Sequence, residues 1–132
     1  MRPTVSVAVK PNARRALGEL GERLAVQHLE AKGYRILDRN WRTREGEIDI
    51  VAEVSGTVAF VEVKSRRSCL MGTAAESLTA AKQRRMVTMA EAYDASRDDL
   101  PPGRRIDLVA IDFTREGRLL SLEHYESAVT AD

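Results

Sequence analysis

The segment Gly46–Lys64, GEIDIVAEVSGTVAFVEVK, decides how this chain folds. Its second half, Val58–Lys64, is the most apolar stretch of the protein, which predicts a central strand of a sheet. Ser55-Gly56 is a turn signal, and the residues before it predict a strand from Glu47 to about Glu53. The segment therefore predicts a hairpin of two largely buried strands.

Outward from this hairpin, helical and extended patterns alternate. Before it, Ala16–Lys32 has a helical apolar arc and stops at Gly33, which suits a left-handed helix cap. The other expected elements are a short strand at Tyr34–Leu37, a helix from about Ala74 to Tyr93, a strand at Ile106–Phe113 and a last strand around Leu119–Tyr125. The order αβββαββ predicts one mixed α/β domain over residues 15–126, a mixed sheet flanked by helices. Residues 1–14 are expected to form a flexible arm and residues 127–132 a loose tail.

Length and composition bound the class of protein. The 132 residues fit one domain, and 43% apolar with 31% charged residues is an ordinary balance for a globular protein. No apolar run approaches the roughly 20 residues of a membrane span, and the N-terminus is too polar for a secretory signal. The single cysteine, Cys69, excludes an internal disulfide and a cysteine-based zinc cluster. A reducing cytoplasm is the simplest setting.

The net charge is only +1, but the basic residues occur in clusters along the sequence. If the fold gathers them on one side, they can follow a phosphate backbone, whereas the alternative is solvated faces balanced by nearby acids. The candidates for nucleic-acid contact are Arg42, Arg44, Arg66, Arg67 and Lys82.

Glu62 and Lys64 are the first candidates for chemistry. Strand side chains alternate, so these two project from the same face, after Val58 and Phe60. Two charges at the end of a buried strand are costly unless they are paired or bind something. Alone, such a short motif favours an ordinary strand end whose acid and amine pair with each other.

Asp49 changes that balance, because it lies among apolar residues on the partner strand of the hairpin. A short turn puts Asp49 beside Glu62, and two adjacent carboxylates repel unless a hard cation such as Mg²⁺ binds both through oxygen. The cation keeps waters, one of which can become a nucleophile, and Lys64 can orient that water or stabilise charge on a phosphate. The alternative is a buried Asp49 satisfied by turn amides.

The two helices offer further candidates. Glu22 lies at the border of the apolar arc of the first helix and can point into a cleft, whereas Glu19 is expected to be a solvated charge. Lys82 lies within the apolar stripe of the second helix, where a lysine needs an acid, a phosphate or a route to water. His28 and Trp41 are expected to pack, and Asp107 to be structural, paired with Arg105 or a basic residue of the second helix. Cys69 lacks the companion histidine of a nucleophile.

The motifs of this chain resemble, in their order, the YraN family of small bacterial proteins. They are Gly21-Glu22, Gly33-Tyr34, Arg39-Asn40, Gly46-Glu47-Ile48-Asp49 and Phe60-Val61-Glu62-Val63-Lys64-Ser65-Arg66. The resemblance runs from about Leu17 to Tyr125. That family is similar in turn to archaeal Holliday-junction resolvases and the PD-(D/E)xK nuclease superfamily.

This superfamily resemblance implies a restriction-endonuclease-like fold with Mg²⁺ or Mn²⁺ held between Asp49 and Glu62. It implies that Lys64 is the catalytic lysine, that Glu22 matches the helix-borne acid of the resolvases, and that Lys82 matches a frequent basic residue of the second helix. The Pro-Asp that names the superfamily is Ile48-Asp49 here. The resolvase resemblance also favours a homodimer.

The leading hypothesis is therefore a Mg²⁺- or Mn²⁺-dependent endonuclease acting on DNA, with branched or recombination-associated DNA as the expected substrate. A nucleic-acid-binding module with little turnover and a protein adaptor in DNA processing are the alternatives. The set Asp49, Glu62 and Lys64 favours the enzyme, because a pure binder has no need of acids that repel phosphate.

Overall fold

The computed structural model describes residues 11–67 and 78–130. Its elements follow the predicted order αβββαββ. They are α1 (Pro11–Ala31), β1 (Arg35–Thr43), β2 (Gly46–Val54), β3 (Thr57–Arg67), α2 (Ala80–Ala95), β4 (Gly103–Phe113) and β5 (Leu119–Val129). The chain is an α/β domain with a five-stranded mixed sheet and two helices, consistent with a restriction-endonuclease-like fold.

The strands lie in the sheet in their chain order, with β3 in the centre. All neighbours are antiparallel except β3 and β4, which run parallel from Thr57–Gly103 to Arg67–Phe113. Parallel neighbours need a crossover connection, and the connection between β3 and β4 contains α2. The prediction of a central strand at Val58–Lys64 is confirmed.

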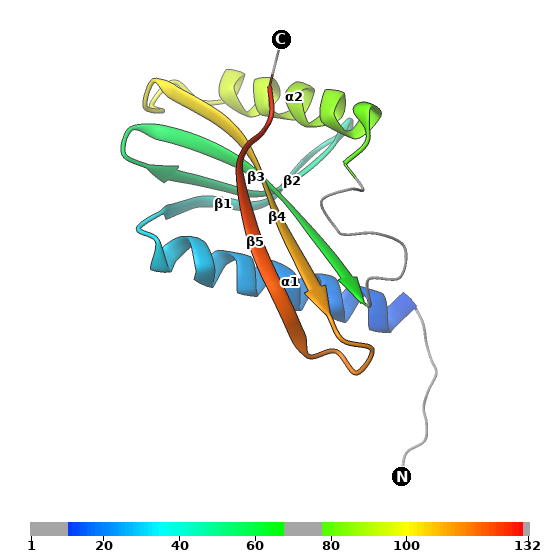
Figure 1. Cartoon of the computed structure of the whole chain (residues 1–132). Coiled ribbons are helices and arrows are strands. Elements are labelled where there is room, and N and C mark those ends of the chain that lie inside the picture. The colour runs from blue at the N-terminus through cyan, green and yellow to red at the C-terminus, as the bar shows by residue number, and fades with distance from the viewer. Residues whose placement is uncertain (1–10, 68–77, 131–132) are drawn as a thin grey trace.

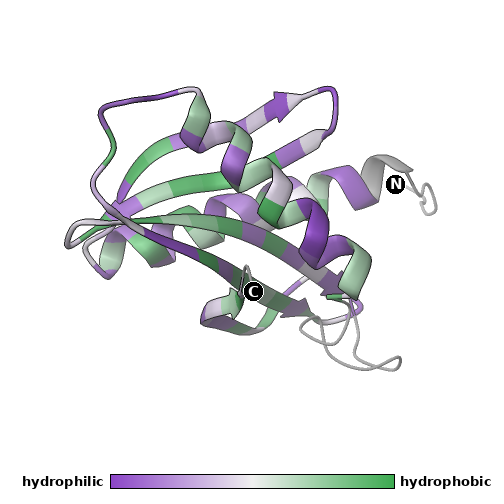
Figure 2. Ribbon diagram, turned by 90° about the horizontal axis from the view of Figure 1, so that it is seen from above, coloured by the Kyte–Doolittle hydropathy of each residue, from purple (hydrophilic) through white to green (hydrophobic). Residues whose placement is uncertain are grey.

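The two helices cover opposite faces of the sheet (Figure 1), and β3 contributes to both packing layers. Ala59 and Val61 are buried in the cluster on the α1 side, whereas Val58 and Phe60 are buried in the cluster on the α2 side. A strand buried on both faces has a continuous apolar run instead of an alternating one. Figure 2 shows this apolar centre of the sheet between the two helices.

Several element boundaries differ from the prediction. The helix α1 begins at Pro11, so residues 11–14 belong to it and not to an arm, and proline is well tolerated in the first turn. Residues 1–10 lie outside the described residues, as does the predicted start of α2 at Ala74. The described part of α2 begins after Thr79, whose hydroxyl accepts a 3.2 Å hydrogen bond from the N–H of Lys82 as an N-cap.

Two strands are longer than expected. β1 continues past Asp38 to Thr43, because a register shift between Ile36 and Asp38 and a left-handed Asn40 (φ 53°) keep it paired with β2. β5 continues to Val129, so residues 127–129 are strand and not a loose tail. Residues 131–132 lie outside the described residues.

A close approach fixes α1 against β3. A Cβ placed on Gly21 would lie 2.0 Å from Oγ of Ser65, so only glycine fits without movement of the Ser65 side chain. Ser65 Oγ is itself buried and has no hydrogen-bond partner among the described residues. This contact sets how near the middle of α1 comes to the C-terminal half of β3.

The fully buried Asp107 on β4 ties together three parts of the fold. Its carboxylate accepts two 2.9 Å bonds from Arg105, one of 2.8 Å from Nε2 of His124 and one of 3.0 Å from the N–H of Ser127. Burial would raise the pKa of Asp107, but these hydrogen bonds outweigh it and hold the pKa below its usual value. The predicted pairing with Arg105 is confirmed, and Asp107 has the structural role expected of it.

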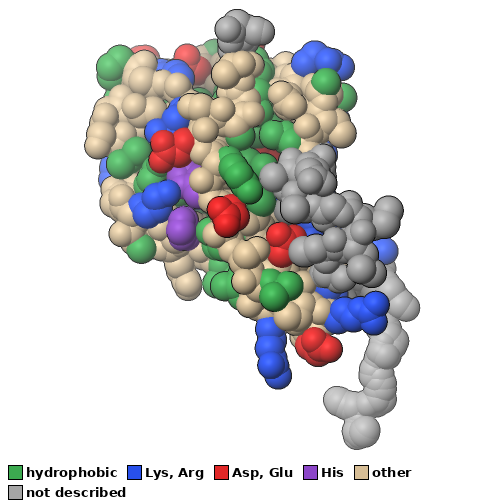
Figure 3. All heavy atoms as spheres, in the orientation of Figure 1, with side chains coloured by type: hydrophobic (Ala, Val, Ile, Leu, Met, Phe, Trp, Pro, Cys, Tyr) green, Lys and Arg blue, Asp and Glu red, His purple; other side chains and the backbone are tan. Residues whose placement is uncertain are grey.

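Histidine lies among charged groups on the face that carries β5 (Figure 3). The side chain of His124 is only 2% exposed, and its Nδ1 accepts a 2.7 Å hydrogen bond from Lys32 of α1. His28 is half-buried at a ring distance of 6.2 Å from His124, as expected for a packing residue. In the described part of the chain, no helix has the length and apolar character needed to cross a membrane.

Candidate active site

The site begins where β2 separates from β3. The pairing of these strands extends from Val54–Thr57 only to Ile50–Val61, whereas β3 remains paired with β4 as far as Arg67. Beyond Ile50, the side chain of Asp49 replaces the missing ladder bond, because its Oδ2 accepts a 2.8 Å hydrogen bond from the N–H of Val63. The carboxylate is thereby fixed in the opening between the two strands.

Two cavities meet at this opening, and Asp49 and Glu62 line both of them. The larger, about 650 Å³, is a cleft between α1 and the end of β3 that also contains Glu22, Lys64 and Arg67. The smaller, about 190 Å³, lies on the α2 side and includes Lys82 and Arg85. The fold thus brings Glu22, Asp49, Glu62, Lys64, Arg67 and Lys82 to one place.

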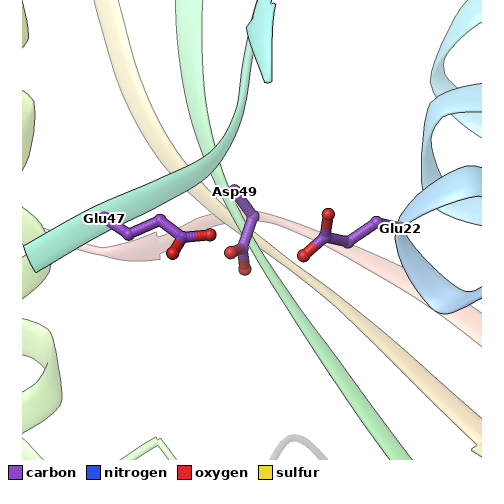
Figure 4. Close-up of side chains that lie close together, drawn as sticks. All are labelled: Glu22, Glu47 and Asp49. Atoms are coloured by element: carbon purple, nitrogen blue, oxygen red, sulfur yellow. The ribbon is translucent and has the colours of Figure 1, made fainter. Parts of the chain in front are cut away.

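Three carboxylates converge within this opening. Oxygen atoms of Glu22, Glu47 and Asp49 lie within 4.8 Å of one another. Figure 4 shows Glu22 reaching in from α1 and Glu47 and Asp49 from β2, with the carboxylates turned toward one another. Our sequence reasoning did not select Glu47, although its position two residues before Asp49 on the same strand was a usable signal.

Asp49 and Glu62 have raised pKa values, as expected of neighbouring acids that are shielded from water. Burial, reinforced by the charge of Glu62 and then of Glu22 and Glu47, raises the pKa of Asp49 to about 8 against the opposing Val63 hydrogen bond. Burial also raises the pKa of Glu62, while Lys82 and Lys64 partly oppose the shift. Ionised, these acids need positive charge nearby.

The pKa of Lys64 depends on the charges of Lys82 and Glu62. Burial lowers its pKa, the proximity of Lys82 lowers it further, and Glu62 opposes the change. Glu62 and Lys64 therefore do not form a simple isolated pair at a strand end. Both the ammonium of Lys64 and the carboxylate of Glu62 belong to a shared cluster that includes the second helix.

The other basic candidates are spread around the site. Arg42 on β1 donates a 3.2 Å bond from Nε to Glu47, and Arg67 at the end of β3 lines the larger cleft. Arg44 is exposed in the turn before β2, and Arg66 is half-buried on β3. Arg14, which the prediction placed in an arm, also lines the cleft because α1 begins earlier than expected.

The donor set suits a hard divalent cation. All the converging atoms are carboxylate oxygens, which Mg²⁺ and Mn²⁺ prefer over nitrogen or sulfur ligands. Asp49 and Glu62 are the acids common to both cavities. Glu22 lines the larger cavity with them and lies within 4.8 Å of Asp49, whereas Glu62 is not one of the three acids of the 4.8 Å group. These residues fit a cation that relieves the mutual repulsion of the cluster.

The remaining candidates lie outside this cluster. Glu19 is exposed on α1, as expected for a solvated charge. Trp41 packs at a ring distance of 5.1 Å from Tyr93, in the cluster beneath α2. Cys69 falls outside the described residues.

The fold and this acidic opening define a restriction-endonuclease-like α/β domain with a candidate cation site. The chain belongs to the family described as "Uncharacterised protein family UPF0102", whose pattern matches residues 21–111, and this is the YraN family that the motifs resemble. The matched region contains Glu22, Glu47, Asp49, Glu62 and Lys64.

Relatives in this family match almost the whole chain. A UPF0102 protein of Symbiobacterium thermophilum is 48% identical over 80% of this chain and 89% of its own length. UPF0102 proteins of Roseiflexus castenholzii and Chloroflexus aurantiacus are 45% and 44% identical, over 88% and 92% of this chain and 94% and 99% of their own lengths. The chain is thus similar to these proteins over most of its length.

Proposed function

We propose that this protein is a metal-dependent nuclease that hydrolyses phosphodiester bonds in DNA, acting in the cytoplasm on branched or recombination-associated DNA. The observation that carries the proposal is the placement of Asp49, Glu62 and Lys64 in one cleft with Glu22 and Arg67. Acids and bases within one cleft suit a bound cation together with a phosphate.

The acids hold the cation in this proposal. Asp49 and Glu62 are the ligands, with Glu22 as a third carboxylate from α1, and Mg²⁺ or Mn²⁺ is the ion that they bind. When bound, the cation supplies a Lewis acid for the phosphate and lowers the pKa of water. The 2.8 Å bond from Val63 orients Asp49, so the ligand is fixed by the backbone of β3.

The bases hold and stabilise the phosphate. Lys64 lies beside Glu62 and places positive charge where negative charge grows on the phosphate during attack. Arg67 in the cleft and Lys82 in the smaller cavity extend this positive charge on both sides of the acids and are assigned to neighbouring phosphates, together with Arg42, Arg44 and Arg66.

A panel of labelled linear, flapped and four-way DNA substrates, with RNA controls, tests the proposal with Mg²⁺ and with Mn²⁺. We expect the wild-type protein to cleave at least one DNA substrate, and Asp49→Ala to abolish cleavage while keeping the fold. Glu19→Ala is the matched control, because Glu19 is an exposed acid on the helix that carries Glu22.

Cleavage by the Asp49→Ala variant at the wild-type rate would show that the site is wrongly assigned. A wild-type protein that binds the DNA panel but cuts nothing with either metal would instead favour a binding module with little turnover. Absence of both cleavage and binding would favour an adaptor.

A further inference from the structure

A single amide group lies between two of the three converging carboxylates. Nδ2 of Asn40 donates a 3.0 Å hydrogen bond to Oε1 of Glu22 and another of 3.0 Å to Oε2 of Glu47. An amide nitrogen carries two hydrogens, so one side chain can serve both acids. Because Glu22 belongs to α1 and Glu47 to β2, the amide of Asn40 on β1 joins the helix to the sheet across the site.

The backbone explains how Asn40 reaches this position. It adopts a left-handed conformation (φ 53°) within β1, a conformation that asparagine tolerates better than most residues. Its neighbours Arg39 and Trp41 pair with Ile50 and Ile48 of β2, so Asn40 lies across from Asp49. The left-handed residue therefore lies opposite the site acid Asp49.

The two acids are held differently. Glu47 has a donor at each oxygen, because Nε of Arg42 donates to Oε1 at 3.2 Å and Asn40 donates to Oε2. Among the described residues, Glu22 receives a side-chain hydrogen bond only at Oε1, from Asn40. Glu47 is thus restrained from β1 on both sides, whereas Glu22 depends on Asn40 for its place beside Asp49.

The amide of Asn40 offsets the repulsion between the carboxylates of Glu22 and Glu47. Ionised carboxylates within 4.8 Å repel one another, and without a donor the flexible Glu22 would turn toward water. A neutral amide stabilises both acids without cancelling their charge, whereas a lysine or arginine in the same place would compete with a cation for them. At Glu22 the only side-chain donor among the described residues is this neutral amide, which leaves the charge of the acid available to a cation, whereas Glu47 is also paired with Arg42.

We propose that Asn40 is a positioning residue of the cation site: its amide holds Glu22 and Glu47 beside Asp49 so that the cluster is assembled before the cation binds. This inference rests on the proposed function for the identity of the ion. Residues that orient metal ligands typically contribute roughly 10- to 100-fold to metal affinity. Because Asn40 and Glu47 are exposed, we expect an effect of about tenfold, the lower end of that range.

Asn40→Gly tests the inference, because glycine keeps the left-handed backbone and removes only the amide. Ser55→Gly is the matched control, since Ser55 is also left-handed (φ 48°) but lies in the turn after β2, away from the site. Calorimetric titration with Mn²⁺, without nucleic acid, should give about tenfold weaker binding for Asn40→Gly and wild-type binding for Ser55→Gly. Both variants should have similar melting temperatures without metal.

A double-mutant cycle tests whether Asn40 acts through the two acids. In a Glu22→Gln/Glu47→Gln background, adding Asn40→Gly should change Mn²⁺ affinity by less than about twofold. A tenfold loss that persists in this background would overturn the inference, as would wild-type Mn²⁺ affinity in Asn40→Gly. Neither of these two outcomes would contradict the proposed nuclease activity.

Measurements of Mn²⁺ binding and DNA cleavage by the wild-type protein distinguish a failure of the proposed nuclease activity from a failure of the role of Asn40. If the wild-type protein binds no Mn²⁺, both the metal-dependent nuclease and the role of Asn40 are overturned. If wild type binds Mn²⁺ and Asn40→Gly binds it about tenfold more weakly, but no DNA is cut, the role of Asn40 stands and the nuclease activity falls.

Discussion

The backbone N–H of Val63 donates a 2.8 Å hydrogen bond to the carboxylate of Asp49, at the point where β2 and β3 stop pairing. In a regular hairpin, that amide would bond to a carbonyl of the partner strand. Here the carboxylate of Asp49 accepts the bond in place of that carbonyl. The same hydrogen bond therefore fixes the position of Asp49 and marks the end of the β2–β3 pairing. Changes at Asp49 should therefore affect both stability and metal binding.

Asp49→Asn should stabilise the metal-free protein at neutral and alkaline pH. The pKa of Asp49 is raised from 3.8 to about 8 in the folded protein. The folded state thus holds the proton more tightly than the unfolded state, so wild-type stability falls as the pH rises from about 4 to about 8. An amide oxygen can still accept from Val63, but it carries no charge.

Urea unfolding with a chelator, at several pH values, measures this effect. The gain in the free energy of unfolding should be largest near pH 8 and should disappear toward pH 4. Glu19→Gln, which changes an exposed acid on α1, should show little gain at any pH. A gain for Asp49→Asn that does not vary with pH would mean that ionisation of Asp49 is not the cause.

Lys64→Ala should separate metal binding from chemistry. Lys64 places its charge beside Glu62 but offers no ligand to a cation, so cleavage should fall by roughly 100-fold or more while Mn²⁺ affinity changes little. Single-turnover cleavage and calorimetry measure the two quantities, and Arg115→Ala, an exposed cation in the turn after β4, is the control. Equal losses in both quantities would place Lys64 in the metal site itself.

Gly21→Ala should destabilise the fold by about 1–3 kcal/mol, because the new Cβ would overlap Oγ of Ser65. Adding Ser65→Ala removes that oxygen and should restore much of the loss. Gly18→Ala on the same helix is the matched control: its Cβ meets nothing within 4 Å, so it should raise stability by about 0.5–1 kcal/mol. Urea unfolding measures all four proteins. Independent effects of Gly21→Ala and Ser65→Ala would refute the steric explanation.

Arg67→Gln should weaken DNA binding and lower the slope of log affinity against log salt by about 1, because Arg67 lines the cleft. Fluorescence anisotropy without divalent metal, at several salt concentrations, measures both. Arg35→Gln is the control, since Arg35 is paired at 2.6 Å with Glu53 at the opposite end of β2. An equal change of slope in Arg35→Gln would mean that DNA does not follow the cleft.

The sequence predicted those parts of the site that depend on local periodicity. Alternation along β3 put Glu62 and Lys64 on one face, and the helical stripe of α2 singled out Lys82, which does line a cavity with both acids. Asn40 stood in the Arg39-Asn40 motif, but its role was not predicted, because it depends on a left-handed residue within a strand that was expected to end before it. The end of β5 was missed for a similar reason, since the contact of Ser127 with Asp107 joins residues far apart in the sequence.

The network around Asp107 has a consequence for biosynthesis. Arg105 lies on the same strand as Asp107, but His124 and the N–H of Ser127 belong to β5, which the ribosome makes later. A nascent chain that has reached only β4 can pair Asp107 with Arg105, but it lacks the donors of His124 and Ser127 until residue 127 has emerged. The β2–β3 hairpin can therefore form during translation, whereas the α1 side of the sheet around Asp107 closes only after β5 has been synthesised.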